Sequence, residues 1–197
     1  MDFAKRSQEV FKQELTELEK VSRRIGNEMN DVVDLIYSCS GKVVVTGIGK
    51  TGIIGHKIAS SLASTGTPSF FMNAAEAMHG DLGMIGKDDI VILMSHSGTT
   101  KETLAVIPTL KKISGGLIGF TSGKDSPLAR ESDYRLIYPK LAEADPLNLA
   151  PTVSSTMMLV LGDALACALS EKRDFTREDF HIYHPGGSLG EELKGDK

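Results

Sequence analysis

The sequence predicts an α/β protein with a three-layer α/β/α sandwich, in which a central, mostly parallel five-stranded sheet follows an N-terminal helical segment. Two observations predict this class. Short apolar runs alternate with segments of helical periodicity, which is typical of a parallel sheet covered on both faces. The 197 residues also fit one hydrophobic core, with a helical hairpin expected over 1–38 and a doubly wound core and C-terminal segment over 39–197.

The N-terminal segment is expected to be helical. Apolar side chains in the first 38 residues recur at steps of three and four, which places them on one helical face, and a second helix is expected from Asn30 to Tyr37. This hairpin could pack on the rest of the domain or form a contact between subunits. The pattern fits either role, or both.

Five short apolar runs have the length and the flanking turn residues of strands. They are Lys42–Thr46, Pro68–Met72, Asp89–Ser95, Leu117–Thr121 and Tyr134–Tyr138. Helices are expected over Gly52–Ser64 and, as one element, through Leu104 and Leu110. The apolar run Met157–Leu169 is shorter than the ~20 residues that a membrane span needs, so we expect a buried core or interface helix.

Composition narrows the classes of function. The 26 acidic and 22 basic side chains give a net charge of −4, whereas a nucleic-acid-binding protein normally has a basic excess. Cys39 and Cys167 have no other metal-ligating residue type at a useful spacing, so both are expected to be free thiols in a reducing compartment. The charged N-terminus does not resemble a secretory signal. We therefore expect a cytoplasmic protein with neither nucleic acid nor a membrane as its partner.

The first candidate ligand loop follows the first expected strand. Residues 47–52 read Gly-Ile-Gly-Lys-Thr-Gly, which matches the G-x-G-x-x-G pattern of dinucleotide sites. It is not a Walker A loop, because Val44 stands where the first glycine of that motif would be. Backbone N–H groups around Gly49 and Thr51, together with the charge of Lys50, would suit an anion at a helix N-terminus. The alternative is a tight turn that needs small residues.

The second candidate loop, residues 95–100, follows the third expected strand and reads Ser-His-Ser-Gly-Thr-Thr. The hydroxyls of Ser95, Ser97, Thr99 and Thr100 suit a phosphate monoester, whereas a helix cap would explain only one of them. Two anion-binding loops at one sheet edge predict a short phosphorylated ligand between them. A dinucleotide is the alternative, with Glu76 as its acidic partner, but it would not need the second loop.

Longer stretches of the sequence carry a specific resemblance. They are GKVVVTGIGKTG (41–52), ASTGTPSFF (63–71), EAMHGDLGM (76–84), SHSGTTKE (95–102), LAPTVSSTMMLVLGDALACAL (149–169) and FTREDFHIYHPGGSLG (175–190). Their order and spacing resemble the SIS (sugar isomerase) family, and within it the arabinose-5-phosphate isomerases, from the N-terminal helices to about Leu193. The resemblance implies the SIS fold in a single domain, 1–197.

Two departures from the family pattern qualify this resemblance. Many members continue into a pair of cystathionine-β-synthase-type (CBS) domains, whereas this sequence ends at Lys197, so regulation through such domains is expected to be absent. A glutamate that is common in the second loop is replaced by Thr99, which removes any role for an acid at that position.

The resemblance also implies four catalytic residues. Aldose–ketose isomerisation needs a base near C2, an acid or base for the oxygens, and stabilisation of the enediolate. The resemblance implies that Lys50 stabilises enediolate or phosphate charge, that Glu102 is the general base, and that Glu143 is its partner acid or base. His184 would open the sugar ring or move a hydroxyl proton, and its distance in sequence from the loops suggests that it acts in a neighbouring subunit.

Some of these residues have plainer alternative roles. Glu102 could merely complement a helix dipole, Glu143 could be a solvated loop residue, and His184 could be structural. His79 is expected to bind substrate, although together with Glu76 and Asp81 it could hold a metal ion at a spacing that matches no standard zinc site. We expect no metal and no cofactor.

Other polar residues receive weaker assignments. Thr152 and Ser154 precede or open the long apolar helix, where one would be an N-cap and the other could line the sugar pocket. His96 could flank the ligand or point to solvent. His56 and His181 are interpreted as ordinary residues on helix faces.

The function implied by the resemblance is interconversion of D-arabinose 5-phosphate and D-ribulose 5-phosphate through an enediol(ate). This reaction would supply biosynthesis of Kdo, the eight-carbon acid sugar of bacterial lipopolysaccharide or capsule. A homotetramer is expected, and a downstream sugar nucleotide could inhibit the enzyme. The alternatives are an isomerase of another sugar phosphate, a non-catalytic sugar-phosphate-binding regulator, and a nucleotide-dependent oxidoreductase.

Overall fold

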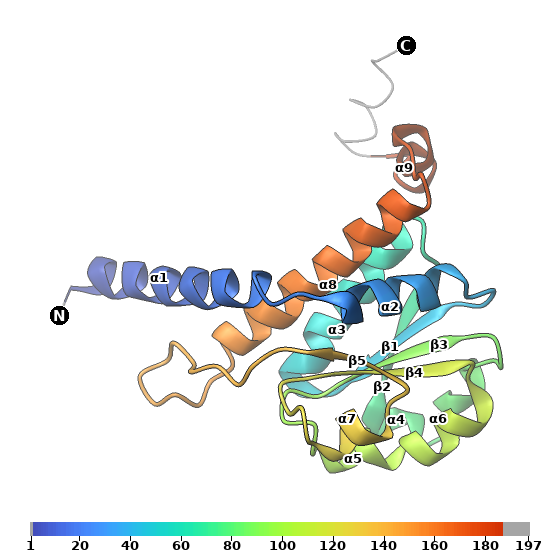
Figure 1. The fold of residues 1–197 in the computed structure, drawn as a ribbon, viewed down its shortest axis with the longest axis horizontal. Coiled ribbons are helices and arrows are strands. Elements are labelled where there is room, and N and C mark those ends of the chain that lie inside the picture. Colours follow the sequence, from blue (N-terminus) through green and yellow to red (C-terminus); the bar gives the residue numbers. More distant parts are fainter. Residues whose placement is uncertain (1, 187–197) are drawn as a thin grey trace.

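The computed structural model describes residues 2–186, in which strands alternate with helices from β1 onward (Figure 1). In chain order the elements are α1 (Phe3–Ser22), α2 (Asn27–Tyr37), β1 (Val43–Gly47), α3 (Gly49–Ser64), β2 (Ser69–Asn73), α4 (Ala74–Ala77), η1 (Asp81–Met84), β3 (Ile90–Met94), α5 (Lys101–Ala105), α6 (Ile107–Ile113), β4 (Gly116–Thr121), α7 (Pro127–Glu131), β5 (Tyr134–Ile137), α8 (Val153–Lys172) and α9 (Arg177–Tyr183).

The strands form one sheet in the order β2-β1-β3-β4-β5, and every pairing is parallel. Thr46 of β1 is level with Met72 of β2 and Leu93 of β3, so these strands end together at one edge. The five-stranded parallel sheet expected from the sequence is confirmed. Each strand lies within one residue of its expected bounds, because buried β-branched and apolar runs are a strong signal for parallel strands.

Side chains that alternate along the strands are buried on opposite faces of the sheet. Val43 and Val45 of β1 face the layer of α2, α3 and α8, whereas Val44 faces the layer formed by α4 to α7. Figure 1 shows these two helical layers above and below the sheet. The expected three-layer α/β/α sandwich is therefore confirmed. The assignment of 1–197 to a single domain stays a prediction, because 187–197 lie outside the described residues.

Several helices differ from their expected bounds, and α2 begins at Asn27 and not at Asn30. α3 begins at Gly49 and not at Gly52, because the chain turns into the helix through a positive φ of 60° at Gly49. The single helix expected through Leu104 and Leu110 is wrong. It is divided at Val106 into α5 and α6, with Pro108 in the first turn of α6, because proline cannot donate the backbone hydrogen bond that a continuous helix requires.

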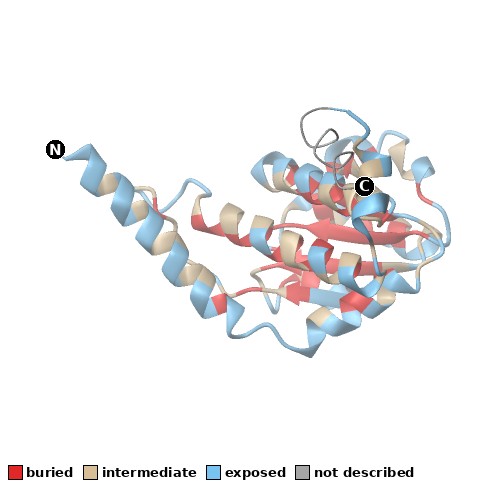
Figure 2. Cartoon of the chain, turned by 90° about the horizontal axis from the view of Figure 1, so that it is seen from above, coloured by how far each residue is buried: buried red, intermediate tan, exposed pale blue. Residues whose placement is uncertain are grey.

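The N-terminal helix α1 extends beyond the sheet (Figure 2), and Val21 near its C-terminal end is its one buried residue among those described. Part of α1 nevertheless contacts the loop between β5 and α8. The amide of Gln13 donates to the carbonyls of Ala142 and Glu143 at 3.1 and 3.2 Å, and Arg6 donates to the carbonyl of Ala144. α1 therefore holds this loop.

Helix α8 is longer than the expected Met157–Leu169 run and is apolar enough to cross a membrane by length and composition alone. Half of its most apolar stretch is buried inside the domain, where it packs against α3, α2 and α1. Its Asp163 pairs with Lys57 of α3. The expected core helix is therefore confirmed. Cys167 on this helix and Cys39 are both free thiols, as expected.

Candidate active site

The crevice between β1 and β3 is the point at which the connections of the sheet diverge. From β1 the chain continues to β2 on one side, and it then crosses to β3 on the other side. Ligands of doubly wound sheets bind in such a crevice, beyond the carboxyl ends of the strands. Here loops 47–52 and 95–100 are neighbours, since a Cβ atom added to Gly47 would lie 3.1 Å from the carbonyl oxygen of Met94.

The first loop merges into the start of α3. Lys50 and Thr51 lie in the first helical turn, and Lys50 is exposed. No side chain caps this helix at Ile48. The N–H groups of the first turn, including that of Gly49, thus keep their capacity to donate to an anion, and Lys50 adds a positive charge beside them.

The second loop is held together by its own hydroxyls. Ser95 is buried, and its Oγ accepts from the Gly98 N–H at 3.1 Å and lies 2.9 Å from Thr100 Oγ1. Ser97 Oγ accepts from the Thr99 N–H at 3.2 Å and lies 2.8 Å from Thr99 Oγ1. Since Ser97 and Thr99 are exposed, a ligand can reach them, whereas Ser95 stabilises the loop from within.

A cavity of about 260 Å³ opens beside these loops, between the start of α3 and the start of α8. It is lined by Lys50, Thr51, His96, Lys140, Leu141, Glu143, Asn148, Leu149, Pro151, Ser154, Ser155 and Met158. The cavity therefore brings together two of the expected catalytic residues, Lys50 and Glu143. Of the expected substrate-binding residues, Thr51 and Ser154 also line it.

The carboxylate of Glu143 is fixed at the N-terminus of α8. Its Oε2 accepts from the N–H and Oγ1 of Thr152, at 2.8 and 3.1 Å, and from the N–H of Ser154 at 3.2 Å. Burial raises the pKa of Glu143, but the hydrogen bonds from Ser154 and Thr152 outweigh it, so the pKa is lower than usual. Glu143 is thus an ionised carboxylate with a fixed orientation, and Thr152 positions it.

His96 lies on the wall of the same cavity and is half-buried. Its Nδ1 lies 2.8 Å from the hydroxyl of Tyr138, which is completely buried just beyond the end of β5. Burial lowers the pKa of His96, and Lys140 acts in the same direction, while Glu143 opposes them. The prediction that this side chain flanks a ligand thus fits the structure better than the prediction that it points to solvent.

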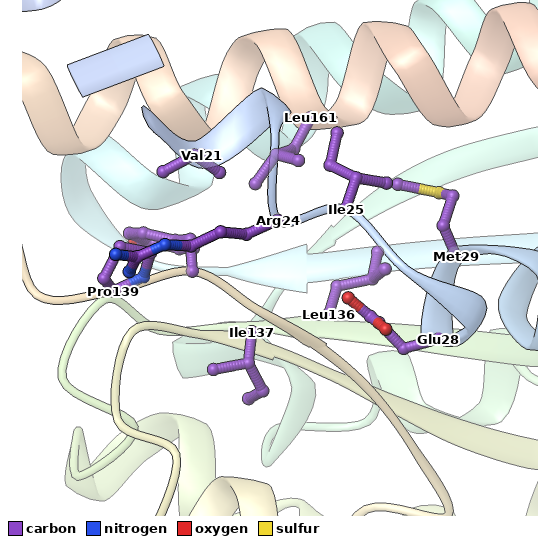
Figure 3. Close-up of a pocket in the computed structure, with 10 residues that line it drawn as sticks. Val21, Arg24, Ile25, Glu28, Met29, Leu136, Ile137, Pro139 and Leu161 are labelled. Carbon is purple, nitrogen blue, oxygen red and sulfur yellow. The ribbon is translucent and has the colours of Figure 1, made fainter. Parts of the chain in front are cut away.

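A second cavity, of about 160 Å³, lies behind Tyr138 and is lined mostly by apolar residues (Figure 3). They come from the segment joining α1 and α2, from β5 and from α8 and include Ile25, Leu136 and Leu161, with Arg24 extending toward Pro139. The carboxylate of Glu28 in its lining accepts one hydrogen bond, from the Gly26 N–H, and no hydroxyl loop borders this cavity among the described residues. We therefore place the candidate active site at the first cavity, with Tyr138 in the wall between the two.

Nine expected site residues do not line the active-site cavity. Gly49, Ser95, Ser97, Thr99 and Thr100 belong to the two loops, and Thr152 contacts Glu143, but the other three lie elsewhere. Glu102 is exposed in the first turn of α5, and His79 is exposed in the turn after α4. His184 follows α9, beyond the far end of α8 from Glu143 (Figures 1 and 2), and stacks on Phe180 with ring centroids 3.9 Å apart. A helix of 20 residues is ~30 Å long, so His184 cannot reach Glu143 within the chain.

Sequence reasoning missed Tyr138 and Lys140 and left His96 undecided. A signal for His96 was available, because side chains alternate at the end of a strand and Ser95 is the buried neighbour. Tyr138 and Lys140 follow the last strand at the ligand-binding edge, yet single aromatic and basic residues there resemble many others. In the described part of the chain, no group of three or more His, Cys, Asp or Glu side chains is placed to hold a metal ion.

Comparisons with known proteins fit this combination of a doubly wound sheet and two anion-binding loops. The sequence model of the SIS domain matches residues 36–168, and the chain belongs to the SIS domain family. Arabinose 5-phosphate isomerase KdsD of Pseudomonas aeruginosa is 48% identical over 193 residues, which are 98% of this chain and 59% of that protein. The KdsD of Escherichia coli K12 is 47% identical over 192 residues, 98% of this chain and 58% of that protein.

A solved structure covers the same part of the chain. The protein c3406 of E. coli CFT073, in complex with arabinose 5-phosphate, is 50% identical, with a TM-score of 0.88 over 90% of this chain and 95% of that chain. The chain spans slightly less than three fifths of the two curated relatives, but nearly all of this solved chain. The SIS fold and family membership predicted from the sequence are therefore confirmed.

Proposed function

We propose that the protein is an aldose–ketose isomerase that interconverts D-arabinose 5-phosphate and D-ribulose 5-phosphate. The observation that carries this proposal is the cavity at the switch point, which the ionised Glu143 and the cationic Lys50 both line beside a hydroxyl loop. The KdsD relatives and the solved complex with arabinose 5-phosphate support the same reaction.

The phosphate is assigned to the two loops. Exposed hydroxyls of Ser97 and Thr99, together with Thr100 at the N-cap of α5, can donate to phosphate oxygens, and Gly49 and Thr51 offer N–H groups from α3. This leaves the sugar carbons over the cavity. Ser154 lines that cavity, while Thr152 acts through Glu143, and His79 contacts the substrate only if a further segment of protein closes over the site.

The reaction moves the C2 proton of the aldose to C1 and the O2 proton to O1. Glu102 does not line the cavity but lies in the first turn of α5, directly after the second loop, and we assign it as the base that removes the C2 proton and returns it to C1. Glu143 is assigned as the group that exchanges protons with the oxygens. Lys50 stabilises the negative charge that builds up on the enediolate oxygens. The hydrogen bonds that lower the pKa of Glu143 keep its carboxylate ionised and oriented at neutral pH.

A homotetramer would complete this site. His184 follows α9, beyond the end of α8 that is far from the cavity of its own chain, so we assign it to the site of a neighbouring subunit, where it opens the sugar ring or moves a hydroxyl proton. The exposed apolar side chains of α1, Phe11 and Leu15, which are 72% and 63% exposed, support an assembly through that helix. Size-exclusion chromatography with light scattering measures the oligomeric state.

The place of the enzyme in metabolism follows from the proposed product. We assign the enzyme to the cytoplasm, where it supplies arabinose 5-phosphate for Kdo and thus for lipopolysaccharide or capsule. The downstream activated sugar nucleotide is the proposed inhibitor, competing at the cavity. An unchanged rate of isomerisation at saturating sugar nucleotide would refute the proposed inhibition.

The decisive experiment measures ribulose 5-phosphate formed from arabinose 5-phosphate, with a chelator present and with ribose 5-phosphate and glucose 6-phosphate as controls. Selective turnover supports both the reaction and its independence of metal. Turnover of another sugar phosphate would change the substrate and keep the mechanism. Tight binding without turnover would replace the isomerase by a sugar-phosphate sensor.

Two variants separate the chemical step from binding. Glu102→Gln should abolish turnover and leave binding of the sugar phosphate nearly unchanged, whereas Ser97→Ala should mainly raise KM. If Glu102→Gln no longer exchanges the C2 proton of the substrate for deuterium from heavy water, this loss would identify Glu102 as the base. If Glu102→Gln keeps most of the wild-type kcat, the base is another group, and Glu143→Gln is then the variant to test.

A further inference from the structure

The pair formed by His96 and Tyr138 has no part in the mechanism described so far. His96 lies within the hydroxyl loop and lines the cavity that holds Glu143 and Lys50. Its Nδ1 lies 2.8 Å from the Tyr138 hydroxyl, so Nε2 is the ring nitrogen that remains for a ligand. The chemistry open to His96 therefore depends on which of the two ring nitrogens carries the proton.

The burial of Tyr138 decides the direction of this hydrogen bond. Tyr138 is 0% exposed, and its hydroxyl has one hydrogen-bond partner within residues 2–186, which is His96 Nδ1. A buried hydroxyl proton without an acceptor is strongly unfavourable, so the hydroxyl donates and Nδ1 accepts. The neutral imidazole then carries its proton on Nε2, on the side that a ligand can approach.

Packing fixes the tyrosine in this role. The Tyr138 ring meets Phe120 edge to face, with centroids 6.0 Å apart, and Tyr138 also lines the mostly apolar cavity of Figure 3. Burial raises the pKa of the Tyr138 hydroxyl, so it remains a donor at neutral pH. Burial also lowers the pKa of His96, with Lys140 adding to this effect against Glu143, which favours the neutral ring.

We infer that His96 is a further catalytic residue, which donates a hydrogen bond from Nε2 to the substrate oxygen that becomes negatively charged in the enediolate, and that Tyr138 is the positioning residue that sets its tautomer. This inference rests on the proposed isomerase function. No proton is transferred by His96 in this step, because the C2 proton passes to the base and returns at C1. A neutral donor strengthens its hydrogen bond as charge develops on the oxygen.

Matched variants test both roles with kinetics. His96→Leu removes the donor and should lower kcat about 100-fold or more with little change in KM, whereas His96→Gln keeps an N–H donor and should recover part of the loss. Tyr138→Phe should lower kcat by about tenfold. Tyr134→Phe, at the exposed start of β5, and His56→Gln, on the exposed side of α3, are the controls and should keep wild-type kinetics.

Nitrogen NMR shifts of the His96 ring give a readout that does not depend on activity. The wild-type protein should show proton occupancy on Nε2 alone, and Tyr138→Phe should show a mixture of both tautomers. A proton on Nδ1 in the wild type would overturn the role of Tyr138. If the wild type turns over substrate and His96→Leu has the same kcat, the role of His96 alone is overturned. If the wild type shows no turnover, the proposed function is overturned, and the role of His96 with it.

Discussion

Gly98 and Gly49 both adopt a positive φ, of 68° and 60°, but they differ in what surrounds them. An added Cβ at Gly49 would meet nothing within 4 Å. At Gly98 it would lie 2.1 Å from the Oγ of Ser126, 2.5 Å from its Cβ and 2.8 Å from Thr121 Oγ1. Alanine at Gly49 thus introduces backbone strain alone, whereas alanine at Gly98 introduces strain together with overlap.

The expected costs follow from these contacts. A left-handed backbone costs a non-glycine residue ~1–2 kcal/mol, which is the whole expected loss for Gly49→Ala. Overpacking adds ~1–3 kcal/mol for Gly98→Ala, because Ser126 is buried and its Oγ caps α7 by accepting from Ala129 N–H at 3.2 Å. Ser126 therefore cannot rotate away without losing a cap.

Urea unfolding followed by circular dichroism measures both losses. Ser126→Gly provides a partly compensating change, since it removes the two closest overlapping atoms and leaves Thr121 Oγ1, and it alone costs only ~0.3 kcal/mol as a cap substitution. In the Gly98→Ala background Ser126→Gly should raise stability. Equal losses for Gly49→Ala and Gly98→Ala, or additive losses in the double variant, would refute the packing argument. Displacement of Ser97 should also raise KM in Gly98→Ala.

Three other perturbations have expected outcomes. Gly162→Ala places a Cβ 2.4 Å from the Ile58 side chain at the contact of α3 with α8 and should lower stability by ~1–3 kcal/mol, measured by thermal unfolding. Ile58→Val in the same protein should recover part of this loss. No recovery would contradict the close contact of Gly162 with Ile58. Glu143→Gln should lower stability at pH 7 by ~1 kcal/mol. Because the pKa of Glu143 is depressed in the folded state, its ionised carboxylate stabilises the fold above the unfolded pKa of ~4.3, and this stabilisation is lost as pH falls through the folded pKa. The stabilities of wild type and variant should therefore converge in acid. A difference in stability that stays constant with pH would argue against a role for the ionised carboxylate. Gln13→Ala should lower stability by less than ~1.5 kcal/mol, yet it should lower kcat because it releases the loop that carries Glu143. An unaltered kcat would show that the orientation of this loop does not depend on α1.

The sequence predicted the strands well because buried strands of a parallel sheet are continuous apolar runs, as in Val43–Gly47. It predicted Lys50 and Glu143 as site residues through family resemblance, and the structure brings both to one cavity. It could not predict that Glu143 accepts hydrogen bonds from Thr152 and Ser154, because this contact depends on how the loop folds back onto α8. Periodicity likewise missed the break at Pro108, since apolar residues on both sides keep the same spacing.

The contacts of α1 with the loop that carries Glu143 make the orientation of the Glu143 carboxylate depend on the N-terminal helix. One side of this helix binds the carbonyls of Glu143 and its neighbours, and Phe11 and Leu15 are left exposed. A truncation that removes Arg6 or Gln13 is therefore expected to loosen the loop that carries Glu143. A lower rate of the proposed isomerisation in such a variant should first be interpreted as the effect of a loosened loop, before it is attributed to any residue of the cavity.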